Sequence, residues 1–251
     1  MTTRFSVKGW AVCCPDPEPF KTFGLDAMNV NKSLLPTSLR RRASLTTQMA
    51  ITAATGACEQ AGTEPRELAS VFASVGGEIR VTDELCLAVA DSTQSLSPTR
   101  FHNSVHNTTA GYWGILHECR LPAVAIAALE DTFAIALLEA CSQLLEYSDD
   151  ILLVCYDEFW PQYLAPPMGS TAFASALVLG TEPGDRPPAW ISLPYIDSGA
   201  PVLNKQLEEL IRAAPVSASI PLLVALNRKN PTTRVPLSPG PHAWYTDLAA
   251  P

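Results

Sequence analysis

The sequence is poor in charge, and it has fewer basic than acidic residues, 17 Lys and Arg against 25 Asp and Glu. Of its 251 residues, 17% are charged and 47% are hydrophobic, and the formal net charge is −8. This balance argues against a nucleic-acid binder, because phosphate binding needs a concentrated basic face. With so little charge, much of the surface must be neutral or apolar, which favours a chain that buries one face against a partner.

Long apolar runs are also missing. The stretch Leu121 to Leu129 is far shorter than the ~20 residues of a spanning helix, so no membrane span is expected. The N-terminal residues lack the apolar core of a secretion signal. The seven cysteines form no CxxC pair and no evenly spaced framework, which is typical of reduced thiols. The sequence therefore predicts a soluble cytoplasmic protein.

Several motifs of cofactor and metal sites are absent. Gly76-Gly77 follows an expected strand, but neither GxGxxG nor a following Gly-Lys-Ser/Thr accompanies it, and the sequence has no GxSxG elbow. His102 and His106 are one helical turn apart, with His117 further along. HNSVH lacks the glutamate of HExxH, and no carboxylate is suitably spaced. We therefore expect no cofactor and no metal.

The sequence does contain an alternation of strand and helix patterns. Apolar runs of strand length and periodic segments of helix length follow one another in the order βαβαβαββ. This order predicts a layered α/β fold with a mostly parallel, mixed sheet. The expected strands are Phe5 to Val12, Leu68 to Val75, Pro122 to Ala128, Asp150 to Tyr156 and Ala172 to Leu179; the expected helices are Pro36 to Ala61, Val81 to Ala90, His102 to Cys119 and Asp131 to Tyr147.

Some details of these elements can also be predicted. Ser38 is expected to cap the first long helix and Gly62 to end it. The segment Pro122 to Ala128 is apolar throughout, so both faces of this strand are expected to be buried.

One large domain followed by a C-terminal extension is expected, with a boundary at residue 185. Residues 1–185 would form the main domain. Residues 186–251 would form an extension with one helix, Asn204 to Ala214, and a Pro-rich tail that is extended or an arm.

Three stretches resemble the condensing enzymes with the thiolase fold. LPTSLRRRASLTTQMAITAATGACEQAG is similar to the long first helix of a β-ketoacyl synthase, and SPTRFHNSVHNTTAGYWGI is similar to the helix that lies against the dimer partner. LPAVAIAALEDTFAIALLEA occupies the place of the strand, elbow and helix that hold the nucleophilic cysteine. The second and third stretches resemble the short chain length factors of bacterial aryl polyene pathways. The resemblance covers Phe5 to Gly180 and implies the N-terminal half of a thiolase-like fold only.

The resemblance implies a chain that does not catalyse condensation itself. Ketosynthase chemistry needs a thiolate at a helix N-terminus, together with two histidines that the family supplies from its second half. LEDTFAIALLEA places Glu130 at the position of the nucleophile, and the neighbouring Leu129, Asp131 and Thr132 also lack a thiol. Glu130 is either an acidic residue that complements the helix dipole or a group that aids decarboxylation.

The resemblance also implies a heterodimer with a full-length β-ketoacyl synthase, in contact across Pro122 to Ala128 and Asn103 to Leu116. In this assembly Tyr112 and Trp113 are either ordinary core residues or bulky groups that limit the length of the acyl tunnel. The residues expected at the tunnel or interface are Asn103, His106, Thr109, Tyr112, Trp113, Leu116, Glu130 and Phe133.

Two further points stay open. The basic run Arg40, Arg41 and Arg42 is either a solvated helix start or a contact for an acyl carrier protein. The chain could also be an independent acyltransferase that uses a cysteine with a histidine base, and Cys119 is the cysteine nearest in sequence to the histidine cluster.

Overall fold

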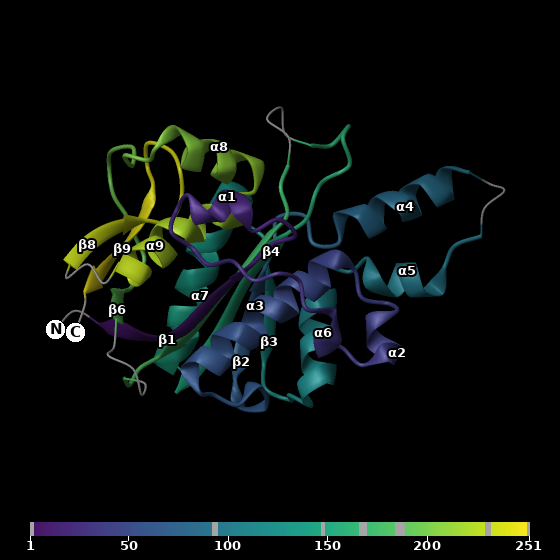
Figure 1. The fold of residues 1–251 in the computed structure, drawn as a ribbon, viewed down its shortest axis with the longest axis horizontal. Helices are drawn as coiled ribbons and strands as arrows, with labels where there is room; N and C mark the ends of the chain where they lie inside the picture. The colour runs from purple at the N-terminus through teal and green to yellow at the C-terminus, as the bar shows by residue number, and fades with distance from the viewer. Residues whose placement is uncertain are drawn as a thin grey trace.

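The computed structural model describes residues 3–91, 95–146, 149–165, 170–183, 189–228 and 232–249. These residues form one sheet with helices on both faces (Figure 1). Its strands are β1 (Arg4–Cys13), β2 (Ala69–Ala73), β3 (Ala123–Ile126), β4 (Asp150–Asp157), β5 (Phe173–Gly180), β6 (Ala189–Ser192), β7 (Tyr195–Ile196), β8 (Thr232–Pro236) and β9 (Trp244–Ala249).

The α-helices of the described residues flank this sheet. They are α1 (Glu18–Lys21), α2 (Thr37–Arg40), α3 (Leu45–Ala61), α4 (Ile79–Ala90), α5 (Pro98–Asn103), α6 (Thr108–His117), α7 (Thr132–Glu146), α8 (Lys205–Ala213) and α9 (Ile220–Arg228). Short 3-10 turns are η1 (Lys32–Leu34), η2 (Pro65–Glu67), η3 (Leu129–Asp131) and η4 (Pro215–Ser219).

The sheet is mixed, with the strand order β3-β2-β4-β5-β1-β6-β9-β7 and β8 paired with β9. Strand β2 runs parallel to both β3 and β4. The pairs β4–β5, β5–β1 and β1–β6 are antiparallel. Strands β4 and β5 are buried on both faces, as their continuous apolar sequences predict. The predicted layered α/β fold with a mixed sheet is confirmed.

A separate apolar core lies on each face of the sheet. One is built from α3 and α6 against β2, β4 and β5. The other is built from α7, α8, η4 and α9 against the opposite face. Since alternate residues of a strand point to opposite faces, β4 and β5 contribute side chains to both cores.

Helix α3 is shorter than the sequence predicted. The expected single helix from Pro36 is divided into α2 and α3, and the N-cap of α3 is Ser44, not Ser38. The Ser44 hydroxyl accepts a hydrogen bond from the Thr47 N–H at 3.0 Å, which satisfies a free donor at the start of the helix. The predicted end is correct: Gly62 adopts the left-handed backbone of a helix C-cap.

Two further predictions about secondary structure are wrong. The expected helix from His102 to Cys119 is divided into α5 and α6 by a turn at residues 104–107, and α5 begins before His102, at Pro98. The strand at Pro122 to Ala128 is not buried on both faces. It is the edge strand β3, half-buried or exposed along its length, because an apolar sequence alone does not show how many neighbours a strand has.

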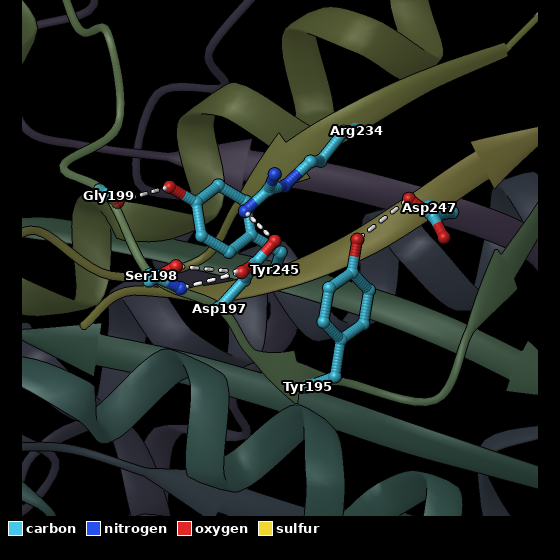
Figure 2. Close-up of polar contacts among 7 residues, drawn as sticks. All are labelled: Tyr195, Asp197, Ser198, Gly199, Arg234, Tyr245 and Asp247. Carbon is cyan, nitrogen blue, oxygen red and sulfur yellow. Dashed lines mark hydrogen bonds and ion pairs between the residues drawn. The ribbon is translucent and has the colours of Figure 1, made fainter.

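The C-terminal segment is more ordered than the sequence predicted. It holds two α-helices where one was expected, and the Pro-rich tail supplies the antiparallel pair β8 and β9. Figure 2 shows one reason: the Arg234 guanidinium pairs with Asp197 at 2.7 Å and lies 3.7 Å from the centre of the Tyr245 ring. The Tyr245 hydroxyl in turn donates to the Gly199 carbonyl at 3.0 Å. The domain boundary at residue 185 stays a prediction.

Candidate functional site

A sharp turn joins β3 to α7 where the sequence placed the position of a nucleophile. Leu129 has a left-handed backbone with φ 50°, which costs a non-glycine residue about 1–2 kcal/mol. The Thr132 hydroxyl donates to the Leu129 carbonyl at 2.7 Å and accepts from the Ala128 N–H at 3.0 Å. We call residues 128–131 the elbow. A strained residue at a turn from strand to helix is a common feature of functional sites.

The predicted site residues Glu130 and Phe133 lie on either side of the start of α7. Glu130 is exposed in η3, next to Asp131, where negative charge complements the dipole of the helix. Phe133 is fully buried in the core against the sheet. The left-handed residue is Leu129, one position before Glu130, and no residue of the elbow carries a thiol.

A groove of ≈1070 Å³ opens beside the elbow. The C-terminal segment forms its other wall, through residues 200–215 and 239–241. The described residues that line the groove include no cysteine, histidine, serine, threonine, lysine or tyrosine. Two of its ionisable residues, Glu208 and Arg212, pair with each other at 2.6 Å. No sequence pattern indicated that the two segments meet here.

The predicted interface residues around the start of α6 make two sets of hydrogen bonds. Asn103 is buried, its amide donates to the Arg42 carbonyl at 2.6 Å, and its side-chain oxygen accepts from the Tyr112 hydroxyl at 3.3 Å. The Thr109 hydroxyl lies 3.1 Å from that of Thr47 on α3. These contacts hold the N-terminal end of α6 against α3.

The large side chains of α6 are divided between core and surface. Trp113 is 1% exposed, and its ring lies 6.5 Å from Phe72 and 4.1 Å from His117, centre to centre. Tyr112 is also buried in this core. Leu116 is half-buried, whereas Ile115 is 64% exposed. On α6, Ile115 is therefore the large apolar side chain most available to another molecule.

Exposed apolar side chains also mark the helices before α6. Figure 1 shows α4 and α5 side by side, reaching out from the body, and an ion pair joins Arg100 of α5 to Glu84 of α4 at 3.2 Å. We call this pair of helices the arm. Its exposed large apolar side chains are Leu87, Val89 and Phe101.

A family model of the β-ketoacyl synthase N-terminal domain matches residues 15–232 of the chain. The chain belongs to this family. No curated protein sequence matches it. The family match continues beyond Gly180, where the sequence placed the end of the resemblance.

Solved structures show that this ketosynthase domain has a thiolase-like fold over its whole length. One is the ketosynthase ApeO in complex with its chain length factor ApeC from Xenorhabdus doucetiae. The match has 22% sequence identity and a TM-score of 0.71, and it covers 98% of this chain and 99% of the other. A second is AntDE:AntF, a type II polyketide synthase acyl carrier protein with its ketosynthase, at 11% identity, 100% coverage of both chains and TM-score 0.75. A third is the ishigamide ketosynthase/chain length factor, at 13% identity, 99% coverage of both chains and TM-score 0.67.

Six of the seven cysteines of this ketosynthase domain are buried or half-buried, and Cys86, on α4, is exposed. All seven are free thiols, and Cys13, Cys14, Cys58, Cys141 and Cys155 are buried. Burial raises the thiol pKa of Cys13, Cys14, Cys58 and Cys141 to about 12, and it raises that of Cys155 as well. The half-buried Cys119 donates to the Leu68 carbonyl at 3.4 Å. No hydrogen bond between a cysteine and a histidine occurs in the described part of the chain.

Three buried carboxylates, Glu78, Asp157 and Glu158, form a cluster that sequence reasoning missed. Asp157 is the last residue of β4, Glu158 follows it, and Glu78 precedes α4. Their only sequence signal was their position after expected strands. His106, a predicted interface residue, borders this cluster: its Nε2 lies 2.9 Å from the Ser74 carbonyl.

The basic run lies beside α5. Arg40, Arg41 and Arg42 are exposed at and after the end of α2, and the Arg42 carbonyl contacts Asn103.

Among the described residues, no group of three His, Cys, Asp or Glu side chains is placed to hold a metal ion. None of the described helices combines the length and hydropathy that a membrane crossing requires.

Proposed function

We propose that this chain is a non-catalytic chain length factor, which forms a heterodimer with a full-length β-ketoacyl synthase and shapes its acyl tunnel. The elbow carries the proposal: a strained turn of the kind that displays a nucleophile carries Leu129 and Glu130, beside a groove lined by neither thiol nor imidazole. Claisen condensation with a thioester intermediate needs both groups. The condensation is therefore assigned to the partner.

Two surfaces support a heterodimer. The edge strand β3 pairs with β2 on one side only among the described strands, so its other edge offers N–H and C=O groups for a strand of the partner. Next to it, α6 exposes Ile115, and the arm exposes Phe101. Large exposed apolar side chains of this kind are typical of a surface that is covered in the assembly.

Side chains on α6 would set the length of the tunnel. Ile115 and Leu116 would face the partner, with Tyr112 and Trp113 supporting them from the core. The predicted part of Asn103, His106 and Thr109 is to hold this end of α6 in place. The solved structures of the same fold that include ketosynthase/chain length factor complexes support this arrangement.

We further propose that an acyl carrier protein binds near Arg40, Arg41 and Arg42, and that the pathway makes an aryl polyene or a related polyketide in the cytoplasm. Carrier proteins are acidic, and the three guanidinium groups are exposed together. One similar structure, of a type II polyketide synthase, includes a carrier protein with its ketosynthase. Seven free thiols suit a reducing compartment.

The alternative of a cysteine-dependent acyltransferase has less support. A nucleophilic cysteine needs a low pKa, access to substrate and a nearby base. The five buried cysteines have raised pKa values, and Cys119 contacts a backbone carbonyl. Cys86 is exposed on α4, but it has no hydrogen bond to a histidine among the described residues.

A reconstituted condensation assay separates the two functions. The chain is purified alone, with the ketosynthase encoded beside it, and with a ketosynthase whose nucleophilic cysteine is replaced by alanine. We expect condensation only with the intact ketosynthase, and no acyl adduct on this chain by intact-mass spectrometry. Within the active complex, Ile115→Ala is expected to lengthen the products, and Ile115→Trp to shorten them. An acyl adduct on the chain alone would contradict the proposal.

A further inference from the structure

The buried carboxylates lie at the base of the arm, where Asp157 accepts from Val75, a residue that also lines the groove beside the elbow. Glu78, Asp157 and Glu158 are 2%, 2% and 4% exposed. The turn from β2 to α4, residues 74–78, passes between the end of β4 and the start of α3. The arm continues directly from this turn (Figure 1), so whatever holds the turn also places the arm.

Asp157 holds the first part of the turn. Its carboxylate accepts from the Ser74 hydroxyl at 2.8 Å and from the N–H groups of Val75 and Gly76 at 3.1 and 3.0 Å. The Ser74 hydroxyl also accepts from the Gly77 N–H at 2.7 Å.

Glu158 and Glu78 hold the second part. Glu158 accepts from the Arg80 N–H at 3.2 Å, which ties it to the first turn of α4. Glu78 accepts from the Ser44 and Thr47 hydroxyls at 2.7 and 2.8 Å, which ties the turn to the start of α3. The second carboxylate oxygen of Glu78 is buried and has no hydrogen-bond partner among the described residues.

Few charges face this cluster from the surrounding elements. From α4, Arg80 favours the ionised form of Glu158, whereas Glu78 opposes it; α3 contributes the Thr46 hydroxyl. His106, from the turn between α5 and α6, favours ionised Asp157. The phenols that face the cluster are Tyr112 of α6, near Glu78, and Tyr156 of β4, near Glu78 and Asp157.

Burial is the main influence on all three acids. It raises the pKa of Glu158 to about 7 and that of Asp157 to about 6, and it raises the pKa of Glu78 as well. Since the pKa values of these acids are raised in the folded chain, the folded chain binds protons at the cluster more strongly than the unfolded chain does. The stabilisation is complete below the ordinary pKa values of the acids and is lost as the pH rises through about 7.

We propose that protonation of Glu158 within this cluster sets how firmly the arm is held, so that the chain binds its ketosynthase partner more tightly at mildly acidic than at alkaline pH. The inference rests on the proposed heterodimer, in which the arm contacts the partner. Loss of the proton leaves neighbouring carboxylates charged at the base of the arm, and their repulsion loosens the turn.

The test compares Glu158→Gln, which keeps the shape of the side chain and cannot ionise, with the parent chain. Glu59→Gln, at an exposed carboxylate of α3, is the matched control. The dissociation constant of the heterodimer is measured by calorimetry from about pH 5.5 to about pH 8. For the parent and Glu59→Gln we expect affinity to fall about tenfold from pH 6 to pH 8, and for Glu158→Gln we expect no such fall.

Hydrogen exchange of the chain alone separates the failure of this inference from the failure of the proposed function. The protection of α4 and α5 amides, relative to α7, should fall with rising pH in the parent and stay constant in Glu158→Gln. If no heterodimer forms at any pH, the proposed function fails and this exchange result decides the inference. Equal pH dependence in parent and Glu158→Gln, in binding or in exchange, would overturn it.

Discussion

The strands β4 and β5 and the arm are opposite in how completely the chain buries them. All eight residues of β5 are buried, and β4 is exposed only partly at its first residue. Helix α4 has twelve residues, and Leu85 is its one buried residue. The chain's own helices therefore cover both faces of β4 and β5, whereas the arm presents apolar side chains that the chain does not cover. Folding of this chain alone buries β4 and β5, whereas the apolar side chains of the arm would be buried only by a partner.

The largest expected effect lies on the core side of this division. Trp113→Ala should lower the free energy of unfolding by about 3–5 kcal/mol, because it removes a fully buried ring. Ile115→Ala, two residues along the same helix but on its exposed side, should change it by less than about 0.5 kcal/mol. Chemical denaturation of both variants measures the contrast, and equal losses would show that α6 is not divided in this way.

The next effect lies on the arm. Phe101→Asp places a charge on a 68% exposed apolar site, so it should leave the free energy of unfolding nearly unchanged but weaken the heterodimer by about 2 kcal/mol. Val202→Asp, at an exposed residue of the C-terminal segment, is the control and should change neither the free energy of unfolding nor the affinity of the heterodimer. Calorimetry with the ketosynthase measures the affinities. Unchanged binding by Phe101→Asp would remove the arm from the interface.

A smaller effect is expected where the two regions meet, in the pH dependence of stability. The pKa of Asp157 is raised from its ordinary 3.8 to about 6, so the folded chain binds the proton more strongly than the unfolded chain. Stability should therefore fall as the pH rises from about 4 to about 6, by about 1–3 kcal/mol. Denaturation curves at several pH values measure this fall, which Asp157→Asn should reduce. A parent stability that rises over this interval would contradict the assignment.

The smallest effect is expected at the elbow. Glu130→Ala should leave condensation by the heterodimer unchanged, because the nucleophile is assigned to the partner, and should cost about 0.5 kcal/mol of stability from the lost charge at the start of α7. The initial rate of the reconstituted complex measures the first quantity and thermal unfolding the second. A rate loss of tenfold or more, with the complex still assembled, would instead support a role for Glu130 in decarboxylation.

The fold was predictable from the sequence for the elements that are buried within this chain. Continuous apolar runs identified β4 and β5, and Gly62 marked the end of α3, because both signals are local. The break between α5 and α6 was missed, since the contacts of Asn103 and His106 that hold this turn come from Arg42 and Ser74, more than 30 residues away.

The site was less predictable for the same reason. The elbow was located through the resemblance of its segment to the turn that holds the nucleophile in β-ketoacyl synthases. The opposite wall of the groove comes from residues 200–215 and 239–241, which were expected to be a separate extension. The carboxylate cluster is assembled from two segments distant in sequence and is hydrogen-bonded by a third at the start of α3, so no spacing within one segment indicates it.

The most direct test of the account is the mass of the assembly that this chain forms with the ketosynthase encoded beside it. The two proteins are co-expressed, purified through a tag on this chain, and examined by sedimentation velocity with light scattering. We predict a single species whose mass equals one copy of each chain, and its dissociation when Ile115→Asp and Phe101→Asp are combined. Recovery of this chain alone, with the ketosynthase as a separate homodimer, would contradict the account.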